Sequence, residues 1–132
     1  MTSAKFNKVV EEQINRCKDI LCVKSEEYAS NDDRLHNFKC AAGLQNCDPK
    51  EALLGMMTKH IVSISDMCRD GKFYDMDIWN EKITDAMNYL LLLKGLVVEE
   101  IRDKEAEYEQ RRKELYEAEV KALKDDLDNR FG

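Results

Sequence analysis

Three polar residues, Glu81, Asp85 and Asn88, lie at positions i, i+4 and i+7 within the stretch from Trp79 to Val98. In a helix this spacing places their side chains on one face. Apolar residues fill the positions between them, and a carboxylate in such a setting is costly unless it is paired, hydrated or bound to a metal. The pattern therefore indicates a functional face, with a solvated acidic face as the structural alternative for Glu81 and Asp85.

A second polar stripe precedes this one, on the helix that we expect from Pro49 to about Asp70. Its members recur at i, i+4, i+7 and i+11: Lys59, Ser63, Asp66 and Asp70. A short loop over residues 71–76 joins the two helices, so we expect an antiparallel pair whose polar stripes face each other.

In that arrangement Asp66, Glu81 and Asp85 form an oxygen-rich pocket. Hard oxygen ligands suit Mg²⁺ or Mn²⁺, with waters and substrate phosphates completing the octahedron. Lys59, and Arg34 from the shorter helix before it, would donate hydrogen bonds to phosphate. The simpler alternative for Lys59 is an ion pair with Asp66 or Glu81.

For the histidine and aromatic side chains near these stripes, packing in the core is the preferred interpretation. His60 lies on the apolar side of its helix, which favours a satisfied core histidine over a ligand. The aromatic residues are interpreted as packing residues, with stacking on a nucleobase as the sharper alternative: Trp79, Tyr89, Tyr28 and Phe38.

Helical periodicity recurs along the whole chain and predicts an all-α fold. Period-two runs bounded by turns, which would indicate strands, are missing. Besides the two central helices, amphipathic stripes predict a helix from Ser3 to Tyr28 and a shorter one from Arg34 to about Leu44. The last helix meets no Pro after Pro49 and is expected to continue to about Asn129.

Local capping signals mark three of the helix starts. Asp48 as N-cap, Pro49 at the first helical position and Glu51 three residues after the cap predict the sharpest start in the chain. Ser3 is expected to cap the first helix, and Asp77 the last one.

The composition restricts the class of partner. The 132 residues carry a formal net charge of −6 with a sequence pI of about 5.0, which argues against a general nucleic-acid surface. The charge still allows a small anion to be held by a few cations. One Pro, five Gly and 36% charged residues are typical of a helical protein of one core domain.

The cysteines and the apolar stretches indicate an intracellular protein. None of the five cysteines forms a CxxC pair, and the two histidines complete no zinc spacing, so buried free thiols are expected. The N-terminus carries charge too early for a signal peptide, and Lys94 breaks the longest apolar stretch before it could span a bilayer. We therefore expect a cytoplasmic protein with no membrane partner.

Beyond Glu99 the composition becomes strongly charged. We expect two parts, a helical domain over residues 1–98 that carries the polar stripes and a charged helical arm over residues 99–132 that continues the last core helix. Apolar positions in the arm repeat every seven residues: Ile101, Tyr108, Leu115 and Ala122. This repeat favours packing on a partner subunit of a homo-oligomer, and a solvated single helix with many i,i+4 pairs is the alternative.

Three blocks of the chain carry a family resemblance. The blocks over residues 33–39 (DRLHNFK), 59–66 (KHIVSISD) and 79–89 (WNEKITDAMNY) resemble the phage and prophage family called nucleotide modification associated domain. This family is related to the all-α MazG-like nucleotide pyrophosphohydrolases. The resemblance covers about residues 5–100, leaves the arm outside, and implies a MazG-like helical bundle in a phage-encoded protein of the host cytoplasm.

The MazG-like group implies an activity as well. Its acidic residues bind Mg²⁺, which holds a nucleoside triphosphate for hydrolysis between the α and β phosphates. Glu81, Asp85 and Tyr89 are similar to the second acidic pattern of the group, although Glu81 stands four rather than three residues before Asp85. The first pattern, E-x-x-E, is not met, because Lys59, His60, Ser63 and Asp66 occupy that helix. Fewer acids weaken a metal site.

The resulting expectation is a protein that binds a nucleotide between helices. As a Mg²⁺-dependent pyrophosphohydrolase, it would use Glu81 and Asp85 in catalysis, with Asp66, Glu81 and Asp85 as metal ligands. The predicted nucleotide-binding residues are Arg34, Asn37, Lys59, Ser63 and Asn88. One alternative is a non-catalytic sponge for a nucleotide-derived defence signal, which would make it an anti-defence protein. Another is a structural helical module for oligomerisation.

Overall fold

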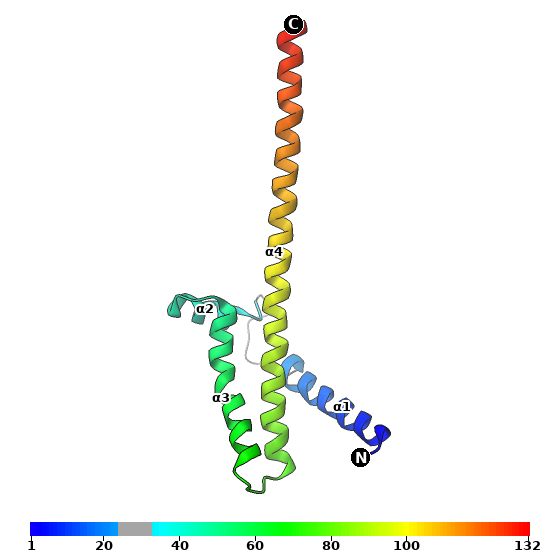
Figure 1. Cartoon of the computed structure of the whole chain (residues 1–132), viewed down its shortest axis with the longest axis vertical. Coiled ribbons are helices and arrows are strands. Elements are labelled where there is room, and N and C mark those ends of the chain that lie inside the picture. Colours follow the sequence, from blue (N-terminus) through cyan, green and yellow to red (C-terminus); the bar gives the residue numbers. More distant parts are fainter. Residues whose placement is uncertain (24–32) are drawn as a thin grey trace. The chain divides into compact units, whose positions relative to one another are not determined.

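The protein is all-α, as predicted, over the residues that the computed structural model describes, 1–23 and 33–132. The elements follow in the order α1 (Ser3–Lys18), the π-helical turn η1 (Asp19–Val23), α2 (His36–Gln45), α3 (Pro49–Arg69) and α4 (Met76–Phe131) (Figure 1). The chain divides into two compact units, Met1–Leu96 and Val97–Gly132.

The first helix differs from its prediction at both ends. Thr2, rather than Ser3, is the N-cap, and its hydroxyl accepts a hydrogen bond from the backbone N–H of Lys5 at 3.2 Å. The α-helix ends at Lys18 and continues as the π-helical turn η1. Residues 24–28 of the expected helix lie outside the described residues. A π-helical turn is rare and often accompanies a functional site.

Capping chemistry sets the start of α3 as predicted. The Asp48 carboxylate accepts from the Lys50 N–H at 2.8 Å, and Pro49 occupies the first turn. The prediction for α4 is wrong by two residues, because the cap is Asp75 and not Asp77. The Asp75 carboxylate accepts from the Ile78 N–H at 3.0 Å. Asp77 lies within the first turn, where a negative charge is favourable.

The core of the first unit joins α3 to the first part of α4. These two helices run antiparallel, side by side, and are joined by the loop over residues 70–75 (Figure 1). Leu53 is fully buried and packs with the buried residues Leu35, Phe38 and Leu96. The partly buried residues around this cluster include Tyr89. The packing interpretation of Phe38 is therefore confirmed.

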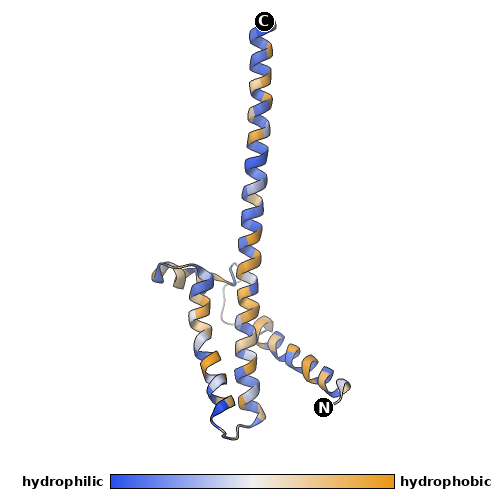
Figure 2. Ribbon diagram, viewed as in Figure 1, coloured by the Kyte–Doolittle hydropathy of each residue, from blue (hydrophilic) through white to orange (hydrophobic). Residues whose placement is uncertain are grey.

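Helix α1 is held against α4 through a polar contact. The Gln13 side-chain amide donates to the Thr84 hydroxyl at 2.8 Å, and Cys17 is buried one turn later. Figure 2 shows apolar (orange) segments along α1. Four apolar side chains of this helix are exposed: Phe6, Val9, Val10 and Ile14.

The five cysteines are free, as predicted. The expectation that they are buried holds for Cys17 alone, because Cys22, Cys40 and Cys68 are exposed and Cys47 is half-buried.

The second unit is a single charged helix up to Phe131, in which apolar residues are interspersed with polar ones (Figure 2). Oppositely charged side chains pair at i,i+4 spacing, for example Lys104 with Glu100 at 3.1 Å and Arg130 with Asp126 at 3.2 Å. Such pairs stabilise an exposed helix by a few tenths of a kcal/mol each, about 0.2–0.5. Ile101, Tyr108 and Leu115 of the heptad repeat are all exposed.

Candidate functional site

A hollow of about 330 Å³ lies where η1, the segment before α2, α3 and the first part of α4 meet. This volume is at the lower end of the range for small-molecule sites, roughly 300–1,000 Å³. Its wall combines three apolar side chains, two rings and three polar side chains: Ile20, Leu21, Leu92, His60, Tyr89, Arg34, Asp85 and Asn88.

Asn88 is the residue that most needs an explanation. Its side chain is buried, with a relative exposure of 6%, and neither its amide nitrogen nor its amide oxygen has a hydrogen-bond partner among the described residues. A buried polar group without a partner costs about 1–3 kcal/mol. Both amide atoms are shielded from solvent in the free protein, so a ligand in the hollow, which Asn88 also lines, supplies the missing hydrogen bonds only if the side chain turns toward it.

His60 links α3 to α4 across the hollow. Its Nδ1 atom lies 3.8 Å from Oδ2 of Asp85, and its ring lies 5.0 Å from the Tyr89 ring, centroid to centroid, at 38°. The two rings and the carboxylate therefore form one continuous wall. The sequence interpretation of His60 as a core histidine missed this position, because a residue on the apolar side of a helix can line a hollow as well as a core.

Arg34 is the cation of the hollow, and its position is fixed by hydrogen bonds around it. Its Nη2 atom donates to the Leu21 carbonyl at 2.8 Å, which leaves other guanidinium donors for a ligand. The adjacent Asp33 carboxylate accepts from the Leu35 N–H at 3.0 Å and from Lys39 Nζ at 2.9 Å. The hydrogen bond from Lys39, followed by that from Leu35, lowers the pKa of Asp33 below its usual value.

The structure brings together three of the predicted site residues. Arg34, Asp85 and Asn88 line the same hollow. The others are not among the lining residues, and all of them except the half-buried Ser63 are exposed: Asn37, Lys59, Ser63, Asp66 and Glu81.

The predicted metal ligands do not converge within one chain. The part of the chain that the structure describes contains no group of three or more His, Cys, Asp or Glu side chains placed to hold a metal ion. Asp66 and Glu81 are exposed, while Asp85 faces His60. The donor set around Asp85, with one carboxylate beside a histidine and an arginine, does not fit Mg²⁺, which prefers several oxygens.

The rotation of α3 explains which residues are absent from the hollow. Met57, His60 and Met67 point inward, and the stripe with Lys59, Ser63 and Asp66 lies about 100° away around the helix, the turn of one residue. The periodicity of a sequence indicates which residues share a face, but not which face meets the neighbouring helix.

Trp79 contributes to a separate cluster at the turn between α3 and α4. Its ring meets the Tyr74 ring edge-on, with centroids 6.1 Å apart, so its packing interpretation is confirmed. The Tyr74 hydroxyl donates to the Asp70 carboxylate, which lowers the pKa of Asp70 and raises the pKa of Tyr74. Tyr28, the remaining aromatic candidate, lies outside the described residues.

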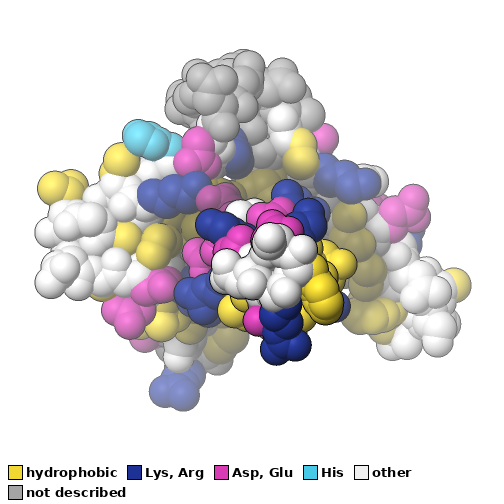
Figure 3. Space-filling model, turned by 90° about the horizontal axis from the view of Figure 1, so that it is seen from above, with side chains coloured by type: hydrophobic (Ala, Val, Ile, Leu, Met, Phe, Trp, Pro, Cys, Tyr) yellow, Lys and Arg dark blue, Asp and Glu magenta, His cyan; other side chains and the backbone are white. Residues whose placement is uncertain are grey.

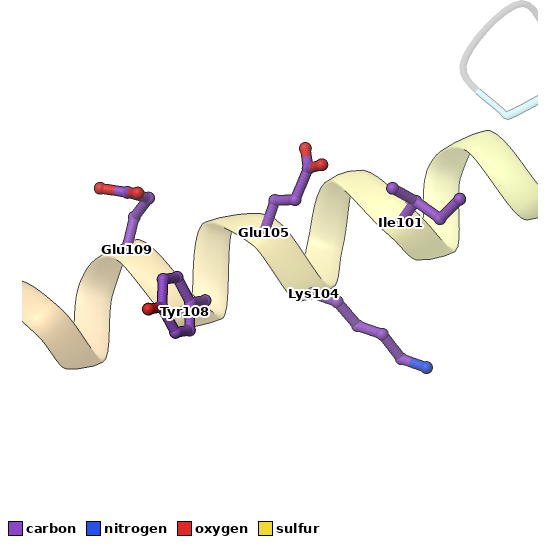
Figure 4. A pocket seen from close by; sticks show the side chains of 5 residues that line it. All are labelled: Ile101, Lys104, Glu105, Tyr108 and Glu109. Carbon is purple, nitrogen blue, oxygen red and sulfur yellow. The ribbon is translucent and has the colours of Figure 1, made fainter.

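A second hollow borders the arm but offers little to a ligand. It is lined by side chains from successive turns of one helix (Figure 4): Ile101, Lys104, Glu105, Tyr108 and Glu109. Its lining among the described residues comes from α4 alone, whereas the walls of the first hollow come from several elements. In the end-on view of Figure 3, basic and acidic side chains are mixed rather than gathered into one basic surface.

Comparison of the chain with protein-family models, with curated proteins and with solved structures finds no match. Among the described residues, none of the helices has the length and apolarity that a membrane span requires.

Proposed function

We propose that the hollow beside α4 binds a nucleotide or a nucleotide-derived small molecule. The observation that carries the proposal is Asn88, a buried amide in the wall of a hollow with neither of its polar atoms satisfied. A stabilising hydrogen bond from a ligand would offset the cost of burying this amide.

The rest of the wall supports this class of ligand. A nucleotide has a flat base with apolar faces, a polar base edge and an anionic phosphate. The Tyr89 and His60 rings offer faces for stacking, Asn88 and Asp85 offer polar atoms for the edge, and Arg34 offers donors for phosphate. Of the predicted binding residues, Arg34 and Asn88 keep this role, and Asn37, Lys59 and Ser63 do not.

Between the two sequence-based hypotheses, binding without turnover is better supported than Mg²⁺-dependent hydrolysis. The charges in the wall of the hollow do not favour a divalent cation, because Asp85 shares it with Arg34. The proposed protein is thus a MazG-like bundle that has kept nucleotide binding. In a phage-encoded setting it would sequester a nucleotide-derived defence signal in the host cytoplasm.

The proposal includes self-association of the first unit. Helix α1 leaves Phe6, Val9, Val10 and Ile14 exposed on one face. A helix of 16 residues is marginal without tertiary packing, and within the described part of the chain this one is anchored mainly through Gln13 and Cys17. A second copy of the chain that covers this face would stabilise α1. This observation is also what favours the remaining candidate, a purely structural oligomerisation module.

The melting temperature of the protein, measured with nucleoside monophosphates and triphosphates in EDTA and in Mg²⁺, tests the proposal. Binding raises the melting temperature of the full chain in EDTA, by an amount that corresponds to about 2.7 kcal/mol at a ligand concentration of 100 Kd. Arg34→Met weakens binding of every nucleotide, whereas the matched variant Arg69→Met, an exposed arginine of α3 outside the hollow, does not. If no nucleotide shifts the melt, the structural module is the better account. Release of pyrophosphate that requires Mg²⁺ would restore the hydrolase hypothesis.

A further inference from the structure

The polar edge of the hollow comes from two neighbouring positions on one helix. Asp85 and Asn88 are three residues apart on α4, so their side chains lie on the same face, and both line the hollow. The Asp85 carboxylate offers acceptors, and the Asn88 amide offers one acceptor and two donor hydrogens. A ligand edge that matches this pair presents donors to Asp85 and an acceptor to Asn88.

We propose that this pair selects a guanine base, an inference that rests on the proposed nucleotide function. The Watson–Crick edge of guanine carries two adjacent donors, N1–H and the N2 amino group, next to the O6 acceptor. The two donors meet the oxygens of the Asp85 carboxylate, and O6 accepts from the Asn88 amide, which is shielded in the free protein and turns toward the ligand on binding. Hydrogen bonds of this charge-assisted, paired kind are shorter and stronger than neutral ones.

The other bases leave part of this edge unmatched. Adenine and cytosine can pair an amino group with Asp85 and the adjacent ring nitrogen with the Asn88 amide, but they leave the second carboxylate oxygen without a donor. Thymine and uracil place one N–H between two carbonyl oxygens, so one of these oxygens also meets the carboxylate. An unmatched polar group in a buried site is the strongest source of discrimination between similar ligands.

The walls and the size of the hollow agree with a single purine nucleotide. The apolar side chains of Ile20, Leu21 and Leu92 contact the faces of a flat base, and the Tyr89 ring adds a stacking surface. A volume of about 330 Å³ accommodates one nucleotide per chain rather than two. Arg34 is exposed at the border of the hollow, where a 5′-phosphate can remain in water.

Asp85 remains available for this role in the free protein. Its distance of 3.8 Å to His60 Nδ1 is longer than a hydrogen bond, so its carboxylate oxygens are not committed to that ring. Its half-buried position strengthens a hydrogen bond to a ligand relative to a bond in open water.

Titration calorimetry of the full chain in EDTA with GMP, IMP, AMP and XMP tests the inference. IMP lacks the N2 amino group of GMP and is expected to bind about tenfold more weakly, and AMP about 100-fold more weakly. Asp85→Asn exchanges one acceptor for a donor, so this variant should prefer XMP, whose O2 carbonyl replaces the amino group. Asp103→Asn, an exposed control on the arm, should keep the wild-type order.

The outcomes separate the two levels of the proposal. Equal or tighter binding of IMP or AMP than of GMP by the wild-type protein overturns guanine selection and leaves nucleotide binding intact. The same holds if Asp85→Asn binds ligands in the wild-type order. Absence of binding for all four nucleotides overturns the proposed function itself. The comparison of GMP with IMP uses the wild-type chain alone, so it is decisive even if Asp85→Asn does not fold.

Discussion

Two buried polar side chains lie one helical turn apart on α4, and they differ in their hydrogen bonding. Thr84, with an exposure of 2%, accepts a hydrogen bond from Gln13 at 2.8 Å. Asn88, with an exposure of 6%, has no partner for either polar atom among the described residues. Both belong to the same helix and both are buried, so helix position and burial alone do not distinguish them.

A structural polar residue differs from a functional one in whether its hydrogen bonds are complete without a ligand. Thr84 attaches α1 to α4, because its hydrogen bond is complete without any ligand. Asn88 lowers stability in the free protein and lines a hollow, which is the trade-off expected where a site is shaped for a ligand. Substitutions at the two positions are therefore expected to change the free energy of unfolding in opposite directions.

The largest expected effect follows from Asn88→Leu. The substitution removes two unsatisfied polar atoms and places apolar atoms beside the hollow, so it should raise the free energy of unfolding by about 1–3 kcal/mol. The same variant should lose nucleotide binding. Urea denaturation and calorimetry on one preparation measure both effects.

The control for this variant is Asn129→Leu, at an exposed position of the arm, which should stay within about 0.5 kcal/mol of the wild-type protein. A loss of stability in Asn88→Leu would mean that the amide is satisfied in solution, and the contrast with Thr84 would then disappear.

A smaller effect of opposite sign is expected for Thr84→Val. The valine keeps the shape of the side chain but no longer accepts from Gln13, so stability should fall by about 0.5–1.5 kcal/mol. Nucleotide binding should remain, since Thr84 is not among the residues that line the hollow. A double-mutant cycle with Gln13→Ala measures the coupling between the two residues. Coupling near zero would show that α1 is held by packing instead.

Local sequence chemistry predicted much of the fold. The Asp48-Pro49 start of α3 was identified correctly because a capping side chain and a proline act on the backbone next to them. The start of α4 was not, since Asp75 and Asp77 are both suitable caps. The choice between them depends on the turn in which Tyr74 bonds Asp70 and packs against Trp79. This arrangement involves residues up to nine positions apart, beyond the reach of a capping pattern.

Helical spacing in the sequence predicted only part of the candidate site. Spacing identified Asp85 and Asn88 as members of one face of α4, and they do line the hollow together. Spacing also selected Lys59 on α3, because it is polar, and passed over His60, because it lies among apolar residues. Whether Lys59 or His60 faces α4 depends on how α3 is rotated about its axis. That rotation is set by the burial of Leu53 and its neighbours.

The smallest expected effect comes from Asp33, whose contacts depend on a titrating carboxylate, whereas the contact at Thr84 is between neutral groups. The pKa of Asp33 is lowered in the folded protein by Lys39 and by the Leu35 N–H, so its ionised form stabilises the fold. This contribution is present above the pKa of the unfolded chain, about 3.9, and is lost as the pH falls through the lower folded value. The difference in melting temperature between wild type and Asp33→Asn should therefore shrink as the pH is lowered from 6 to about 3.

The difference in melting temperature between wild type and Thr84→Val should not change with pH, because neither Thr84 nor Gln13 titrates. A difference for Asp33→Asn that is equally large at both pH values would mean that Asp33 acts through the geometry of the α2 start rather than through its charge.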